Sequence, residues 1–245
     1  VIISPEDAAK LQDDLDVFAP WEDRWMMSFH PDKCTVLTVT KKHKPIVSKY
    51  YLRGHALKHV DSAKYLGTHL DSKLNWHHHV QSVCKKANGM IGFLRRNLNI
   101  ASTSVKSLAY LSLVRPTIEY ASAVWDPFLD CDIRRIEMVQ RRAARYVLNR
   151  YHNTSSVTEM LNTLNWPTLQ DRRCHARLTM MYKIANGLIS IDSANQLIQT
   201  TRSTRRNHPM AFQHISSRTD ARKHSHPRTV VAWNDLPHPV ATAES

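Results

Sequence analysis

After Val80, apolar residues recur every three or four positions, and this spacing constrains the fold more than any other feature of the sequence. Val83, Ala87, Ile91 and Leu94 fall on one face of a helix. The same spacing predicts further helices over three later ranges: 133–147, 157–164 and 169–185. The chain beyond Val80 is therefore predicted to be mainly helical.

The first eighty residues follow a different pattern. Ser4 and Pro5 mark the start of a helix, and Pro20 is expected to break or kink it before Trp21 and Trp25 continue its apolar face. β-branched or alternating runs come next, over 35–40, 46–52 and 63–70. These runs predict a small antiparallel sheet. The chain as a whole is therefore predicted to have an α+β fold that is mainly helical.

The charge of the chain points to an anionic partner. Lys and Arg number 34 against 21 Asp and Glu, which gives a net charge of +13. This balance is typical of a protein that meets phosphates or an anionic membrane, and a basic protein without such a partner is the alternative. No apolar run approaches the roughly 20 residues needed to cross a bilayer. We therefore expect no membrane partner and an intracellular location, nuclear or cytoplasmic.

Arginine is unevenly distributed. Carboxylates are sparse in the segment from 134 to 177, and a local positive field is expected from its arginines: Arg134, Arg135, Arg141, Arg142, Arg145, Arg150, Arg172, Arg173 and Arg177.

No metal site is predicted from the sequence. The histidine run 77–79 cannot converge on one ion, because its members are adjacent and no carboxylate or thiol lies nearby in sequence. The cysteines lack paired spacing and are expected to be reduced thiols: Cys34, Cys84, Cys131 and Cys174. We therefore expect no metal ligand set in this chain.

The adjacent acids Asp13 and Asp14 resemble one half of a two-metal site, since paired carboxylates hold magnesium in nucleotidyl transfer. Leu11 and Leu15 take the buried face of the predicted helix, which turns the pair toward solvent. A solvated helix face is therefore the preferred interpretation.

Six blocks of sequence occur in a recognisable order: "DLDVFAPWEDRWMMSFHPDKC", "KYLGTHLDSKLNWHHHV", "KKANGMIGFLRRNL", "YLSLVRPTIEYASAVWDP", "IEMVQRRAARYVLNRY" and "PRTVVAWNDLP". Together they resemble the downstream part of the reverse transcriptases of non-LTR (LINE-type, jockey-like) retrotransposons. The resemblance implies three regions: a palm remnant at 1–75, a helical thumb at 76–150, and a basic helical C-terminal region at 151–245 with a loop-rich arm at 200–228.

The resemblance also implies roles for individual residues. Lys33 would lie near the incoming nucleotide's phosphates, where a lysine can stabilise or protonate the leaving pyrophosphate. Tyr65, Leu66 and Gly67 would form the primer-grip hairpin, with Gly67 allowing close approach of the backbone to the primer. On pattern alone, a surface lysine is the preferred interpretation of Lys33, and a core residue is an equal alternative for Tyr65.

The resemblance further implies that the basic helix predicted over 133–147 contacts the template-primer duplex. Its arginines would contact phosphates without reading the sequence: Arg134, Arg135, Arg141, Arg142 and Arg145. An RNA template and a DNA primer, or an RNA–DNA duplex, are the implied partners, together with the missing palm and fingers segments. A solvated helix face is the alternative.

The family's metal-binding carboxylates lie upstream of the region that matches this chain. No cofactor is therefore expected in this chain, and Mg²⁺ is expected only in the complete polymerase. The sequence is interpreted as a reverse-transcriptase fragment that holds primer and template and is inactive alone. A stand-alone nucleic-acid-binding adaptor and an inert remnant of a decayed element are the alternatives.

Overall fold

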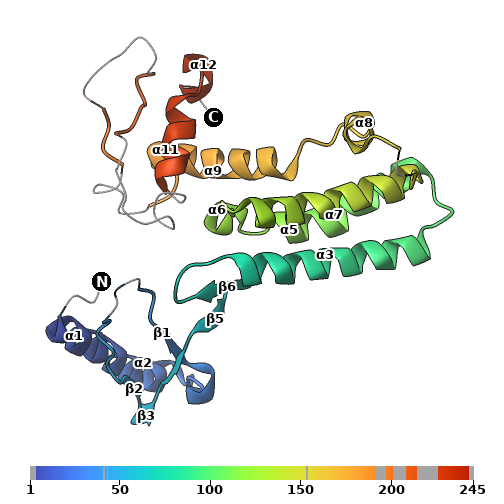
Figure 1. Cartoon of the computed structure of the whole chain (residues 1–245). Coiled ribbons are helices and arrows are strands. Elements are labelled where there is room, and N and C mark those ends of the chain that lie inside the picture. Colours follow the sequence, from blue (N-terminus) through green and yellow to red (C-terminus); the bar gives the residue numbers. More distant parts are fainter. Residues whose placement is uncertain are drawn as a thin grey trace. The chain divides into compact units, whose positions relative to one another are not determined.

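A computed structural model describes residues 4–40, 42, 44–152, 154–190, 197–200, 208–213 and 226–242. The chain divides into two compact units, Val1–Trp76 and His77–Ser245 (Figure 1). Helices account for most of the described residues, and strands occur only in two-stranded sheets. The predicted α+β, mainly helical fold class is confirmed.

The first unit begins with two helices, α1 (Pro5–Asp16) and α2 (Phe18–Trp25). A capping box closes the start of α1: Ser4 Oγ accepts from the Asp7 backbone N–H at 3.3 Å, and Ser4 N–H donates to Asp7 Oδ2 at 2.9 Å. The break falls at Val17 rather than at Pro20. Pro20 lies in the first turn of α2, where its missing N–H leaves no helical hydrogen bond unmade.

The strands of this unit are short and form three separate pairs. Their bounds are β1 (Thr35–Leu37), β2 (Tyr51–Leu52), β3 (His55–Ala56), β4 (Lys58–Val60), β5 (Ser62–Tyr65) and β6 (Thr68–Asp71). The pairs β2–β3 and β5–β6 are antiparallel, whereas β1–β4 is parallel. The expectation of one antiparallel sheet was therefore wrong. The strands β1 and β4 can pair in parallel because a long connection joins them, whereas a tight turn joins only antiparallel strands.

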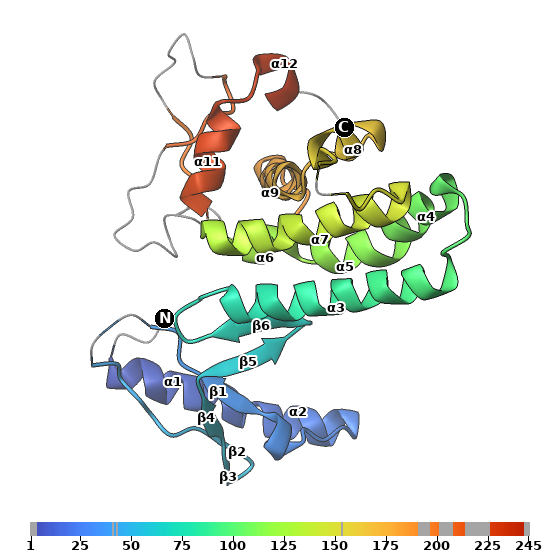
Figure 2. The ribbon, with the colours of Figure 1, turned by 45° about the vertical axis from the view of Figure 1, so that its right-hand side comes forward.

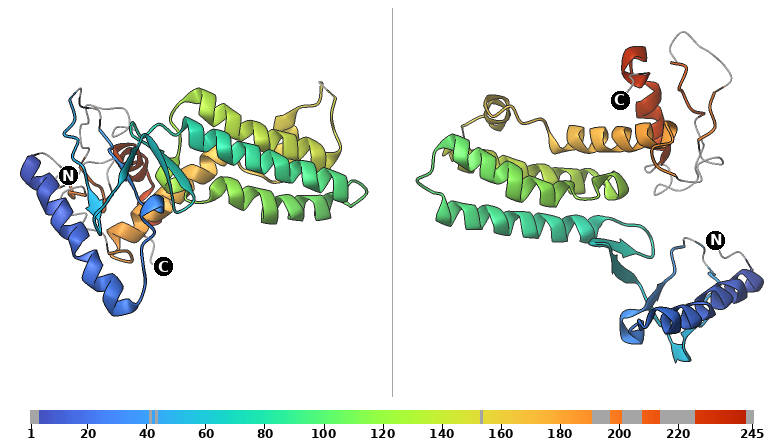
Figure 3. Two further views of the ribbon diagram at one scale, coloured as in Figure 1. Left: turned by 90° about the horizontal axis from the view of Figure 1, so that it is seen from below. Right: turned by 180° about the vertical axis from the view of Figure 1, so that it is seen from behind.

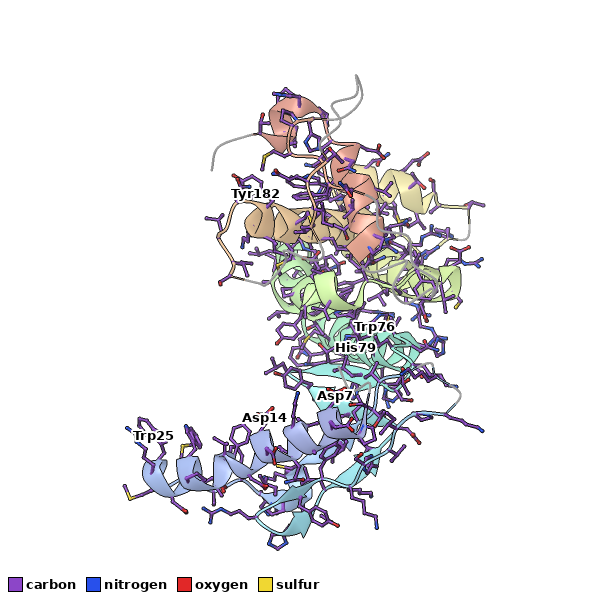
Figure 4. All side chains as sticks on the ribbon, turned by 90° about the vertical axis from the view of Figure 1, so that its left-hand side faces the viewer. Asp7, Asp14, Trp25, Trp76, His79 and Tyr182 are labelled. Atoms are coloured by element: carbon purple, nitrogen blue, oxygen red, sulfur yellow. The ribbon has the colours of Figure 1, made fainter. Side chains whose placement is uncertain are left out.

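Few apolar side chains are buried in this unit. Among its described residues, only Ala8, Tyr50 and Leu52 are buried hydrophobics. The apolar face of the first helices was expected to be buried, but it remains partly exposed to solvent. Leu11 is 37% exposed and Trp25 is 58% exposed. Figure 4 shows Trp25 at the end of α2 and Asp14 on α1.

The second unit consists of helices. Their bounds are α3 (His77–Asn97), α4 (Thr103–Ala109), the π-helical turn η2 (Tyr110–Val114), α5 (Arg115–Glu119), α6 (Ser122–Trp125), α7 (Asp130–Leu148), α8 (Val157–Thr163), α9 (Leu169–Ala185), α11 (His226–Asn234) and α12 (His238–Ala241). The helix α3, the α4–α5 segment and α7 lie side by side (Figure 2). Ala87, Ile91 and Leu94 are buried in this bundle, as their spacing predicts.

A second core joins α9 to α11, which crosses it (Figure 3). Met181 of α9 packs with Val230 and Trp233 of α11 and with Phe212. Trp233 Nε1 donates to the Met210 carbonyl at 2.8 Å. Three tryptophans of this unit are buried, at 0%, 6% and 1% exposed: Trp125, Trp166 and Trp233.

The expected loop-rich arm at 200–228 lies mostly outside the described residues, apart from Thr200, 208–213 and the start of α11. None of the described helices combines the length and the apolar character needed to span a membrane.

Candidate nucleic-acid interface

The helix α7 separates an apolar face from a basic face. Ile136, Val139, Ala143 and Val147 are buried, as predicted from their spacing. The helix ends at Asn149, whose left-handed conformation (φ 52°) stops it. The exposed arginines lie on the opposite side of the helix from these four side chains.

Five arginines predicted to contact nucleic acid lie on α7: Arg134, Arg135, Arg141, Arg142 and Arg145. Arg134, Arg141 and Arg142 are exposed, and the other two are half-buried. Arg142 Nη1 donates to Asn88 Oδ1 of α3 at 3.1 Å, which places this guanidinium at the seam between the two helices.

The basic face of α7 is not neutralised by carboxylates. Within the part of the chain that the structure describes, none of the five arginines forms an ion pair. Of the three acids of this helix, Asp132 is buried against His77, and Glu137 Oε1 accepts from the Gln170 N–H at the start of α9 at 2.8 Å. The third, Asp130, is exposed in the first turn and forms no ion pair among the described residues. The positive charge is therefore available to an external anion.

The helix α3 adds exposed cations that the sequence argument did not assign to the interface: Lys85, Lys86, Arg95 and Arg96. Lys85 lies one turn before Asn88, and Arg96 lies two turns after it, so both share the side of α3 that carries the contact to Arg142. The signal was present in the sequence, because positions 85 and 96 are eleven residues, or three helical turns, apart. One basic surface therefore spans both helices. It consists of Lys85 and Arg96 of α3 together with the five arginines of α7, and it is called the α3–α7 basic face below.

Three arginines of α9 do not belong to this surface, which corrects the expected positive field. Arg173 Nε donates to Asp126 Oδ1 at 2.8 Å, and Arg177 Nε lies 2.9 Å from Asp126 Oδ2. Arg228 pairs with the same carboxylate, and Arg172 pairs with Glu119. Because α9 packs against α6, its arginine side faces the interior, where the carboxylates neutralise part of its charge.

The hairpin β5–β6 carries the three residues expected to grip a primer. Tyr65 pairs with Thr68, and the two-residue turn Leu66-Gly67 has positive φ at both positions, 45° and 84°. Such a turn fits the twist of the two strands, and glycine adopts it without cost while leucine does not. Tyr65 is 65% exposed and Leu66 is 73% exposed, so neither is a core residue.

Lys33 ends a single 3₁₀ turn (Pro31–Lys33) and is exposed. Asp13 and Asp14 are also exposed, as expected for a solvated face. A two-metal site requires converging carboxylates, and these two project from the polar side of α1.

The three histidines follow the strand-to-helix junction and have different environments. His77 begins α3, and its Nδ1 lies 2.8 Å from Asp132 Oδ1. His79 is buried, with its ring edge-on to Trp125 at a centroid distance of 4.8 Å. The fold therefore brings to the histidine run a carboxylate that is 55 residues away in sequence.

Comparison with known proteins finds sequence similarity to several RNA-directed DNA polymerases of mobile elements. The chain is 30% identical over 146 residues, 58% of its length, to the "probable RNA-directed DNA polymerase from transposon BS" of Drosophila melanogaster. It is 27% identical over 142 residues to the RNA-directed DNA polymerase from the mobile element jockey of the same species, and 28% identical over 151 residues to that of Drosophila funebris. Over a little more than half of its length, the chain is similar to jockey-type RNA-directed DNA polymerases. The resemblance to non-LTR reverse transcriptases is thereby confirmed.

The chain spans only about a sixth of the length of these jockey-type relatives, 16% of the transposon BS protein and 15% of the Drosophila melanogaster jockey protein. No family model matches the chain, and no solved structure does. The relationship therefore concerns one part of a much longer polymerase.

Proposed function

We propose that the chain is a fragment of a mobile-element reverse transcriptase whose role is to hold the primer and template. The observation that carries this proposal is the α3–α7 basic face, whose cations form no ion pair with a carboxylate among the residues that the structure describes. Its jockey-type relatives are named RNA-directed DNA polymerases. The ligand is then an RNA–DNA duplex or its component strands.

The basic face would contact phosphates rather than bases. Arginines spaced along parallel neighbouring helices match a line of phosphates, and each contact releases condensed counterions. Binding would therefore be strong at low salt, weak at high salt and nearly independent of sequence.

The hairpin β5–β6 would contact the primer in the complete polymerase. Its exposed tip places Tyr65 and Leu66 in solvent, and its turn holds a leucine in a conformation that costs energy. The exposure of both side chains at the tip supports a functional role, since neither belongs to a core. Lys33 would act near the leaving phosphates in the same complete enzyme.

The test is binding of the full chain to a labelled RNA–DNA duplex, followed by fluorescence anisotropy over a range of salt concentrations. The triple variant Arg141→Gln, Arg142→Gln, Arg145→Gln should weaken binding and reduce the slope of log K against log salt by about 2 to 3, at roughly 0.9 per lost phosphate contact. The matched control removes three exposed cations that lie outside α3 and α7: Lys10→Gln, Arg24→Gln and Lys183→Gln. Equal effects of the two triple variants would mean that net charge, and not the α3–α7 basic face, governs binding.

A further inference from the structure

The starts of α3 and α7 bring three metal-binding side chains together. The two helices run parallel, because contacts between them advance along both sequences: His77 with Asp132, Asn88 with Arg142, and Leu94 with Tyr146. His77 is the first residue of α3, and Cys131 and Asp132 are the second and third residues of α7. Parallel packing therefore places both helix starts at one end of the bundle.

The three ligand atoms lie within 4.8 Å of one another. Asp132 is 1% exposed, and its Oδ1 lies 2.8 Å from His77 Nδ1. His77 and Cys131 are exposed, so an ion can reach the group from solvent. The buried carboxylate forms the inner side of the group, and the two exposed side chains form its outer side.

We propose that His77, Cys131 and Asp132 bind one zinc-class divalent cation. Imidazole nitrogen, thiolate sulfur and carboxylate oxygen are the donors that zinc uses, at bond lengths of about 2.0 to 2.3 Å. Tetrahedral bonds of that length put the donors about 3.3 to 3.8 Å apart. Donors 4.8 Å apart would therefore close by about 1 Å, and His77 Nδ1 and Asp132 Oδ1, now 2.8 Å apart, would separate by about 0.5 Å. Calcium and magnesium prefer oxygen donors throughout and do not match this set.

The donor types of the group fit a zinc-class ion. Cys131, the second residue of the 19-residue helix α7, would bind it as a thiolate. Asp132 supplies a second negative charge, so the ion meets two anionic donors and one neutral imidazole. Three protein donors leave the fourth position for water. The bound ion would fasten the start of α3 to the start of α7, whether or not the chain meets nucleic acid.

The experiment is a titration of the full, chelator-stripped chain with Co²⁺, followed by displacement with Zn²⁺ and elemental analysis. We expect one equivalent of metal and a sulfur-to-cobalt charge-transfer band. Cys131→Ser should abolish that band, and His77→Gln should weaken binding at least tenfold; both side chains are exposed, so these variants should fold. Cys34→Ser and His78→Gln are matched controls that should bind as the parent chain does.

Two results would overturn the site. The first is the absence of a cobalt–thiolate band at one equivalent, which would make the His77–Asp132 contact a hydrogen-bonded tether only. The second is binding that survives Cys131→Ser unchanged, which would indicate scattered binding among the 15 histidines of the chain. Protection of Cys131 from iodoacetamide by Zn²⁺, with Cys34 unprotected, provides a readout independent of the spectrum. Neither outcome depends on nucleic-acid binding, so the site and the proposed function can fail separately.

Discussion

Replacing Asp126 with asparagine should strongly destabilise the helical unit. Asp126 is 8% exposed and is the carboxylate for three guanidinium groups, those of Arg173, Arg177 and Arg228. Burial lowers the pKa of Arg228, which shows how poorly this region solvates a cation. Arg173 is 1% exposed, so loss of the carboxylate leaves a buried charge without its counterion.

The magnitude follows from the cost of breaking a buried ion pair by removing one partner, about 3 to 5 kcal/mol. For a unit of this size, each 1 kcal/mol lowers Tm by about 2 to 4 °C, so Tm should fall by on the order of 10 °C. The measurement is urea and thermal unfolding of the full chain, monitored by far-UV circular dichroism.

The control is Asp235→Asn, the same substitution at an exposed acid, which should change the free energy of unfolding by less than about 0.5 kcal/mol. Adding Arg177→Met to Asp126→Asn should recover part of the loss, because one unpaired buried cation is removed with it. A loss below about 1 kcal/mol in Asp126→Asn would refute the assignment of Asp126 as the required counterion.

Three further outcomes are expected. The full chain should show no primer extension on an RNA template with Mg²⁺ or Mn²⁺, because Asp13 and Asp14 are exposed and do not converge; measurable extension would contradict this. In a longer polymerase that contains this chain, Gly67→Val should weaken primer binding, measured by anisotropy, because a β-branched residue is strained at φ 84°; unchanged affinity would remove Gly67 from the grip. Burial raises the pKa of Cys84 to about 11 from 9.0, so the folded state keeps the thiol proton that the unfolded chain loses. The contribution of Cys84 to the free energy of unfolding should be fully present below pH 9 and should fall by about 3 kcal/mol as the pH rises to 11. In urea unfolding at pH 8 to 11, the free energy of unfolding of Cys84→Ala should fall less steeply with pH than that of the parent chain.

The sequence predicted those features that depend on neighbouring residues. The capping serine Ser4 and the apolar spacing of α3 and α7 act within a few residues, so both appear where they were expected. The turn at Leu66-Gly67 is equally local, because glycine accepts the positive φ that a two-residue hairpin requires.

Features that depend on distant segments were not predictable in this way. The parallel pairing of β1 with β4 is set by how the connection between them folds, and no residue pattern encodes it. Likewise, the His77–Asp132 contact joins positions 55 apart, so a search for nearby ligands could not find it. The exposure of Trp25 also escaped prediction, because helical spacing shows which face is apolar but not whether another element covers it.

The arginines show why composition alone could not locate the interface. Arg134 on α7 and Arg173 on α9 are the same residue type in similar amphipathic helices, yet one is exposed and the other is buried. The difference lies in the acids. Glu137 accepts a hydrogen bond from the start of α9, and no described carboxylate pairs with the α7 arginines. Asp126, in contrast, pairs with Arg173 and Arg177 of α9 in the core. A buried ion pair is costly unless its partner is present, so the α9 arginines are held by the fold and cannot turn outward to meet phosphates. The charge that remains available to an external anion is therefore the part of the net charge that the carboxylates of the fold do not pair.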